Sequence, residues 1–144
     1  MKSNLTGFIG GVIGGLIKLT LDQISYATGI SAVDTAGTFS GILFQGTQYL
    51  EVWIIYLFVT GLAGGLASIL IPVKNLNSYI TIGIIVGVIL WAGMNIIFVI
   101  TGFAAPTWAM GVGSLIVNLI THIVLGITIT YTMFAYKSWT ARTT

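Results

Sequence analysis

The hydrophobic positions of the chain gather in four long runs, which are separated by glycine-rich or polar segments. Each run is long enough for the roughly 20 helical residues that cross the hydrocarbon core of a bilayer. Because two of the three connections are short, consecutive helices should lie side by side and antiparallel. The pattern therefore predicts an all-α integral membrane protein, a single transmembrane domain over residues 1–144 with four helices in an antiparallel bundle, at about 5–24, 51–73, 79–103 and 108–134.

Composition supports the same class. Hydrophobic residues make up 56% of the chain and charged residues only 6%, with a mean hydropathy of +1.05, which is too apolar for a domain that folds in water. The first run is as long as a full span and carries Lys18 and Asp22 near its far end, so we do not expect it to be a cleaved signal peptide. The chain has no cysteine, which excludes disulfides and thiolate chemistry, and its net charge of +2 gives no reason to expect nucleic acid as a partner.

The basic residues outside the spans indicate how the chain is oriented. Four spans return the chain to its starting side, so Lys2, Lys74, Lys137 and Arg142 all fall on one side of the bilayer. Basic residues accumulate in the cytoplasm, and we therefore predict that both termini are cytoplasmic. The long connection, residues 25–50, then lies outside. Its low charge and scattered apolar residues favour a segment on the outer membrane face with a helical turn or two.

Glycines recur at intervals of four in the first three runs, where they form stripes on one helical face. In a soluble helix each glycine costs about 1 kcal/mol relative to alanine, whereas in lipid small residues four apart let two backbones approach closely. Most of these glycines fall in the cytoplasmic half of the bilayer. We expect that half to be tightly packed and the outer half to be wider, with packing positions at Gly7, Gly11, Gly15, Gly61, Gly65, Gly83 and Gly87.

Polar residues extend these stripes toward the outer half. Lys18 and Asp22 continue the glycine face of the first span, Asn95 follows Gly83 and Gly87, and Asn118 and His122 lie four apart in the last span. An ionisable group in lipid costs several kcal/mol unless it is paired or wetted, which makes it a candidate for a functional site. If the stripes face the bundle interior, the five residues form an outward-facing polar pocket, made of Lys18, Asp22, Asn95, Asn118 and His122.

Structural roles are also compatible with each of these residues. Lys18 lies six residues before the expected end of its span, roughly 9 Å along a helix, so it could extend to the head groups and pair with Asp22 locally. His122, Asn95 and Asn118 could be interhelical hydrogen-bonding residues. One histidine and three carboxylates do not suffice for a multidentate metal or haem site, and no nucleotide-binding motif is present, so we expect no cofactor.

Three segments carry a family resemblance: GFIGGVIGGLIK in the first span, GIIVGVILWAGMNIIF before Pro106, and NLITHIVLGITITY in the last span. They resemble the small multi-pass bacterial membrane proteins of the YqhR and YagU type. The resemblance implies a four-helix protein of the bacterial plasma (inner) membrane. It brings no catalytic residues with it.

Three functions remain open at this point. The first is a non-enzymatic membrane protein whose pocket binds or passes a small solute or proton, in an oligomer or a larger membrane complex. The second is a structural or accessory subunit that assembles through its glycine-rich faces, where the polar residues only fix helix register. The third is a membrane enzyme acting on lipid, with His122 and Asp22 as acid and base.

Overall fold

The computed structural model describes residues 2–44, 49–71 and 76–143, and within these ranges every regular element is a helix. A 10-residue helix, α2, and a 3₁₀ turn, η1, accompany four long helices. The long helices contain stretches long and apolar enough to cross a membrane, over Asn4–Ala27, Leu50–Leu70, Ser78–Thr101 and Val112–Trp139. The predicted all-helical class with four candidate spans is confirmed, and the elements are α1 (Lys2–Ala27), α2 (Thr35–Phe44), α3 (Tyr49–Leu70), α4 (Leu76–Thr101), η1 (Thr107–Met110) and α5 (Val112–Thr143).

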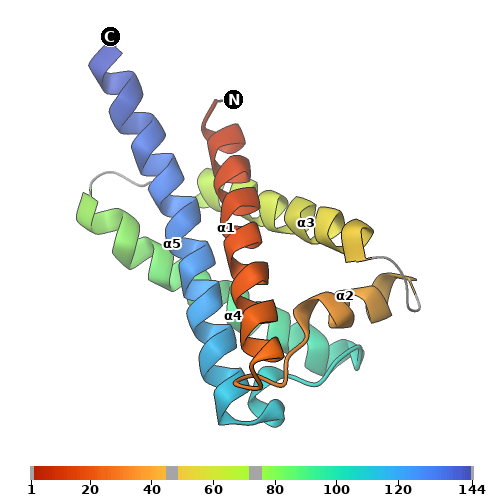
Figure 1. Ribbon diagram of the computed structural model, residues 1–144. Helices are drawn as coiled ribbons and strands as arrows, with labels where there is room; N and C mark the ends of the chain where they lie inside the picture. Colours follow the sequence, from red (N-terminus) through yellow and green to blue (C-terminus); the bar gives the residue numbers. More distant parts are fainter. Residues whose placement is uncertain (1, 45–48, 72–75, 144) are drawn as a thin grey trace.

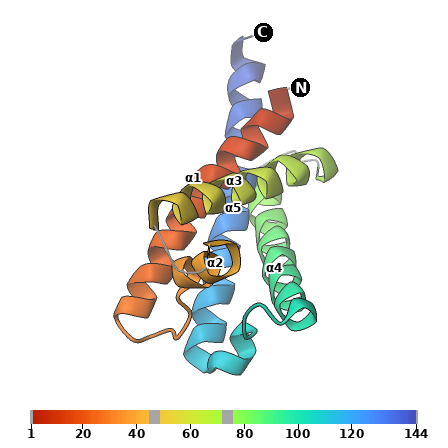
Figure 2. The ribbon, with the colours of Figure 1, turned by 90° about the vertical axis from the view of Figure 1, so that its right-hand side faces the viewer.

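The helices α1 and α5 form the central pair of the bundle (Figure 1). Helix α3 packs mainly on α1 and α4 packs on α5, both inclined to the central pair. The two ends of the chain lie at the same end of the bundle, as both views show (Figures 1 and 2). The α1–α2 and α4–α5 connections lie at the opposite end of the bundle from the termini (Figures 1 and 2).

Glycines allow α1 to approach both of its neighbours. On the α3 side, a Cβ atom on Gly7 would overlap the Gly64 carbonyl, and one on Gly11 or Gly15 would overlap Thr60. On the α5 side, Gly14 faces Leu125 and Thr128. Because only glycine leaves room for these contacts, the α1 stripe fixes the positions of two other helices at once.

Glycines also allow close packing between α4 and α5. A Cβ atom on Gly83 would lie 2.6 Å from Ile127 Cα, and one on Gly87 would lie 2.5 Å from Ile123 Cα. Of the two remaining glycines predicted for packing, Gly61 contacts the Phe8 ring, whereas Gly65 has no atom closer than 3.8 Å to its Cβ position. A Cβ atom would overlap a neighbouring helix at all of the predicted positions except Gly65, against backbone atoms at Gly7, Gly11, Gly83 and Gly87 and against side chains at Gly15 and Gly61.

Most helix boundaries differ from the predicted spans by a few residues, and α5 continues to Thr143, beyond the predicted end at 134. Two of the boundaries have a clear local cause. Helix α4 ends at Thr101, where Gly102 adopts φ +68° and donates its N–H to the Phe98 carbonyl, a common glycine stop signal. The prediction that the last span starts at Trp108 was wrong, because Pro106 opens the turn η1 and α5 starts only after Gly111, at Val112. The predicted inner loop around Pro72 and Lys74 lies outside the described residues.

The long connection contains more structure than the predicted turn or two. Asp34 Oδ1 accepts the Gly37 N–H at 2.9 Å and so caps the first turn of α2. Ala36 of α2 is buried in a core cluster with Leu19, Val52 and Tyr56, which joins α1, α2 and α3. Helix α2 is therefore an integral part of the bundle at the end opposite the termini.

Candidate functional site: a buried polar pocket

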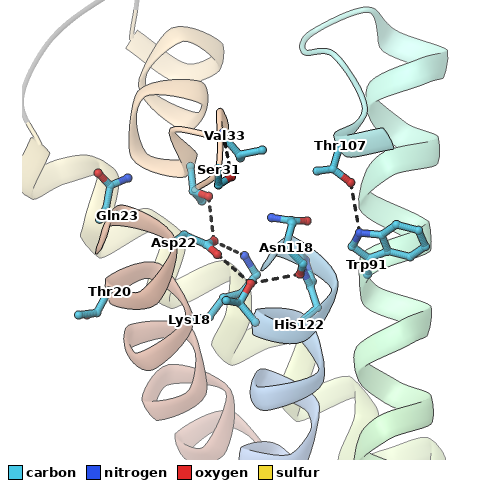
Figure 3. A network of polar contacts seen from close by, with 12 residues as sticks. Lys18, Thr20, Asp22, Gln23, Ser31, Val33, Trp91, Thr107, Asn118 and His122 are labelled. Atoms are coloured by element: carbon cyan, nitrogen blue, oxygen red, sulfur yellow. Dashed lines mark hydrogen bonds and ion pairs between the residues drawn. The ribbon is translucent and has the colours of Figure 1, made fainter. Parts of the chain in front are cut away.

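The Lys18 side chain points into the bundle. Lys18 and Asp22 are 1% and 2% exposed, and Lys18 Nζ donates to Asp22 Oδ2 at 2.5 Å. They lie on successive turns of α1, on the face that the glycines continue. The structure therefore places this pair in the interior and not at the head groups, with the side chains directed at α5 (Figure 3).

Asp22 accepts hydrogen bonds from three different helices. Thr35 Oγ1 of α2 donates to Oδ2 at 2.8 Å, and Thr121 Oγ1 of α5 donates to Oδ1 at 2.7 Å, in addition to the contact from Lys18. Three donors around one carboxylate stabilise its charged form away from water. Sequence reasoning missed both threonines. No signal distinguishes them, because the chain is rich in threonine and a helical threonine usually bonds its own backbone.

A cavity of about 150 Å³ lies beside this pair, at the end of the bundle opposite the termini. Four of the five predicted pocket residues line it, whereas Asp22 is not among the lining residues. The walls come from α1, α3, α4 and α5 together with α2 and the connection before α5. Their larger apolar members are Phe39, Met94, Phe98 and Met110, and their polar members are Lys18, Thr35, Thr38, Tyr56, Asn95, Thr107, Asn118 and His122.

Tyr56 of α3 is buried, with 4% of its surface exposed, although it lies only a few residues from the start of its span. Its ring centroid lies 5.9 Å from Lys18 Nζ, and it packs edge-on against Phe39 of α2. An aromatic ring at that distance provides a favourable surface for the ammonium group. Tyr56 thus supports Lys18 from the α3 side.

Asn95 holds one wall of the cavity in place. Its Oδ1 accepts both the backbone N–H of Thr107, at 2.6 Å, and the Thr107 hydroxyl, at 3.0 Å. Its Nδ2 donates to the Trp91 carbonyl at 2.8 Å. Figure 3 shows the next contact of this group, in which Trp91 Nε1 donates to the Thr107 hydroxyl at 3.3 Å. The Asn95 amide is therefore engaged in positioning the connection that contains η1.

Asn118 and His122 have polar atoms that face the cavity without a partner. His122 Nδ1 bonds the Asn118 carbonyl at 2.7 Å, but His122 Nε2 and the Asn118 side-chain amide have no hydrogen-bond partner among the described residues. The two residues are 7% and 6% exposed, and both line the cavity. No fully buried side-chain nitrogen or oxygen in the described part of the chain lacks a partner, so these atoms are accessible from the cavity. Polar atoms that are open to a cavity are available to a ligand or to water.

The arrangement limits the chemistry of the site. Asp22 does not line the cavity and its carboxylate accepts from three donors, so it is not placed to act as a base on a bound molecule. Over residues 2–44, 49–71 and 76–143, no group of three or more histidine, cysteine or acidic side chains is placed to hold a metal ion. The site is suited to binding a small molecule through hydrogen bonds and apolar contacts.

Four candidate spans and a pocket between them define the class, which is that of multi-pass membrane proteins with an internal polar site. Comparison of the chain with protein-family models, with curated proteins and with solved structures gave no match. The resemblance to the YqhR and YagU type therefore stays a prediction that is based on the three sequence segments given above.

Proposed function

We propose that the protein is a non-enzymatic, multi-pass protein of the bacterial plasma membrane, and that its pocket binds a small solute from the outer side. The observation that carries this proposal is the pair of unpartnered polar groups, His122 Nε2 and the Asn118 amide, beside a buried ion pair. Residues that only fix helix register would be expected to bond one another. These two instead direct their free atoms into a cavity.

The proposed direction of access follows from charge and packing together. The basic residues outside the spans belong to the terminal side, which the positive-inside rule assigns to the cytoplasm. The cavity lies toward the opposite end, and glycine contacts close the bundle on the terminal side of it. A solute would enter from outside, and passage through the chain would require a second conformation or an assembly of copies.

Assembly through glycine faces is less well supported as the main function. The glycines of α1 already contact α3 and α5 within one chain, and Gly83 and Gly87 of α4 contact α5. A stripe that is used within the chain has no free surface for a second copy. A lipid-directed enzyme is also disfavoured, since Asp22 is held by three donors.

Native mass spectrometry of the protein released from lipid nanodiscs tests the binding proposal. The wild type should carry a bound small molecule that is lost in His122→Ala and retained in Asn4→Ala. Asn4 is exposed and lies near the N-terminus, far from the cavity, which makes it the matched control. A bound molecule that is retained equally by all three proteins would contradict the proposal, as would the absence of one from all three.

A further inference from the structure

The charge balance of the pocket restricts what it can bind. Lys18 is the only lysine, arginine or carboxylate residue among those that line the cavity, and the Asp22 carboxylate contacts it from behind. The pair is therefore neutral as a unit. A charged ligand would bring a net charge into a site that has no free counter-charge. No ion pair would then offset the free-energy cost of removing the ligand from water.

The free polar atoms specify complementary groups on the ligand. The backbone carbonyl of Asn118 can only accept a hydrogen bond, so His122 Nδ1 carries the proton and donates it. In the neutral imidazole ring Nε2 then keeps a lone pair. This lone pair needs a donor. The Asn118 side-chain amide offers both a donor and an acceptor. A hydroxyl group can donate to Nε2 and accept from the amide at the same time, which matches both free groups with one substituent.

Four larger apolar side chains form an adaptable part of the cavity wall, which also contains the hydroxyl-bearing residues Thr35, Thr38 and Thr107. Phe39, Met94, Phe98 and Met110 come from α2, α4 and η1, and methionine side chains adjust readily to the shape of a bound group. The volume of about 150 Å³ is close to that of cavities which hold a benzene-sized molecule. The ligand should therefore have an apolar body about as large as a six-membered ring.

We propose that the pocket selects a small neutral molecule that carries a hydroxyl group on an apolar, ring-sized body. This inference rests on the proposed binding function and names the chemical class of its solute. The hydroxyl group would lie between Asn118 and His122, and the apolar body would lie against the phenylalanine and methionine side chains.

Calorimetric titration of the protein in nanodiscs with four ring compounds of similar size tests this class. The probes are phenol, benzene, benzoate and benzylammonium at neutral pH, and titration of empty nanodiscs corrects for partition into lipid. Phenol should bind saturably, benzene should bind about tenfold more weakly, and the two ions should bind more weakly still. His122→Ala and Asn118→Ala should each weaken phenol binding about fivefold, while Asn4→Ala should leave it unchanged.

A further variant tests whether binding requires the cavity itself, in addition to the polar side chains of Asn118 and His122. Ala104 lines the cavity from the connection before η1, so Ala104→Trp should fill the cavity and abolish phenol binding while His122 and Asn118 stay in place. If benzoate or benzylammonium binds more tightly than phenol, and Ala104→Trp abolishes that binding, the neutral class is overturned but the binding function stands. If no probe binds saturably, or if Ala104→Trp changes nothing, both fail.

Discussion

At the level of single residues, the Asp22 carboxylate connects three helices by accepting hydrogen bonds from Lys18, Thr35 and Thr121. Removing one partner of a buried ion pair leaves an uncompensated charge, which costs about 3–5 kcal/mol. Removing both charges can be far less costly, because neither then has to be desolvated.

We therefore expect strong coupling between substitutions of this pair. Asp22→Asn and Lys18→Met should each lower the free energy of unfolding by about 3–5 kcal/mol. The double variant should be destabilised by clearly less than the sum, because neither charge is then buried without its partner. The amide oxygen of Asn replaces one of the two Asp22 oxygens, which accept from Thr35 and from Thr121. Reversible unfolding in mixed micelles gives the free energy of unfolding of the wild type, the two single variants and the double variant. Additive effects would contradict a direct interaction between Lys18 and Asp22 in the interior.

Asn95 permits a second prediction about a single residue. In Asn95→Leu the buried backbone N–H of Thr107 loses its acceptor, which costs about 1–3 kcal/mol and should free the connection before α5. Amide hydrogen exchange at residues 104–110 should become faster, with little change in α1. Asn4→Ala serves as the control, and unchanged exchange at Thr107 in Asn95→Leu would show that this contact does not hold the connection.

At the level of helices, glycine contacts decide how closely α1 approaches its neighbours. A Cβ atom on Gly11 would overlap the Thr60 carbonyl, while the nearest atom to a Cβ on Gly65 is 3.8 Å away. Gly11→Ala should therefore lower the free energy of unfolding by about 1–3 kcal/mol through overpacking. Gly65→Ala should be neutral or stabilising by up to about 1 kcal/mol, since alanine favours the helix. Equal effects at both positions, measured by unfolding in mixed micelles, would contradict the observed packing.

The helices also show which parts of the structure the sequence could predict. The four spans follow from length and hydropathy, and the glycine stripes point toward the helix interfaces, because both signals are local and periodic. Helix α2 and the turn η1 have no such signal. Residues 35–44 are a short mixture of glycine, threonine and serine with apolar residues, and their helix is stabilised by the Asp34 cap and by burial of Ala36.

The candidate site was predictable to a similar extent. Spacing of four along α1 and α5 put Lys18, Asp22, Asn118 and His122 on interior faces, and the structure brings them together. The roles of Thr35, Thr121 and Tyr56 depend on how α2, α5 and α3 approach α1, which no single helix encodes.

At the level of the whole molecule, the outer surfaces of the spans are apolar. Exposed isoleucine and leucine side chains follow α1, α3 and α4 over most of their lengths, a surface that is stable in lipid and not in water. The two ends of the bundle should therefore meet water on opposite sides of the bilayer.

Single-cysteine variants test this orientation, and the cysteine-free chain makes them straightforward. In intact cells, a maleimide that does not cross membranes should label Ala105→Cys, at the mouth of the pocket, because Ala105 is exposed. It should label Ala141→Cys, which follows the last candidate span, only after permeabilisation. Ser68→Cys, buried near the α1 glycines, should stay unlabelled throughout. Labelling of Ala141→Cys in intact cells would reverse the proposed topology.

The connection before α5 lines the pocket but does not hold the long helices together. Ala104, Ala105, Thr107 and Met110 line the cavity, and of these Thr107 bonds Asn95, while the close glycine contacts of α1 and α4 lie elsewhere. A combinatorial library confined to Ala104, Ala105 and Met110 would alter the shape of the cavity wall and spare both the Thr107 contact and the helix interfaces. Such a library offers a route to sensors for other solutes on the same scaffold, and natural variants could diverge in selectivity by the same route.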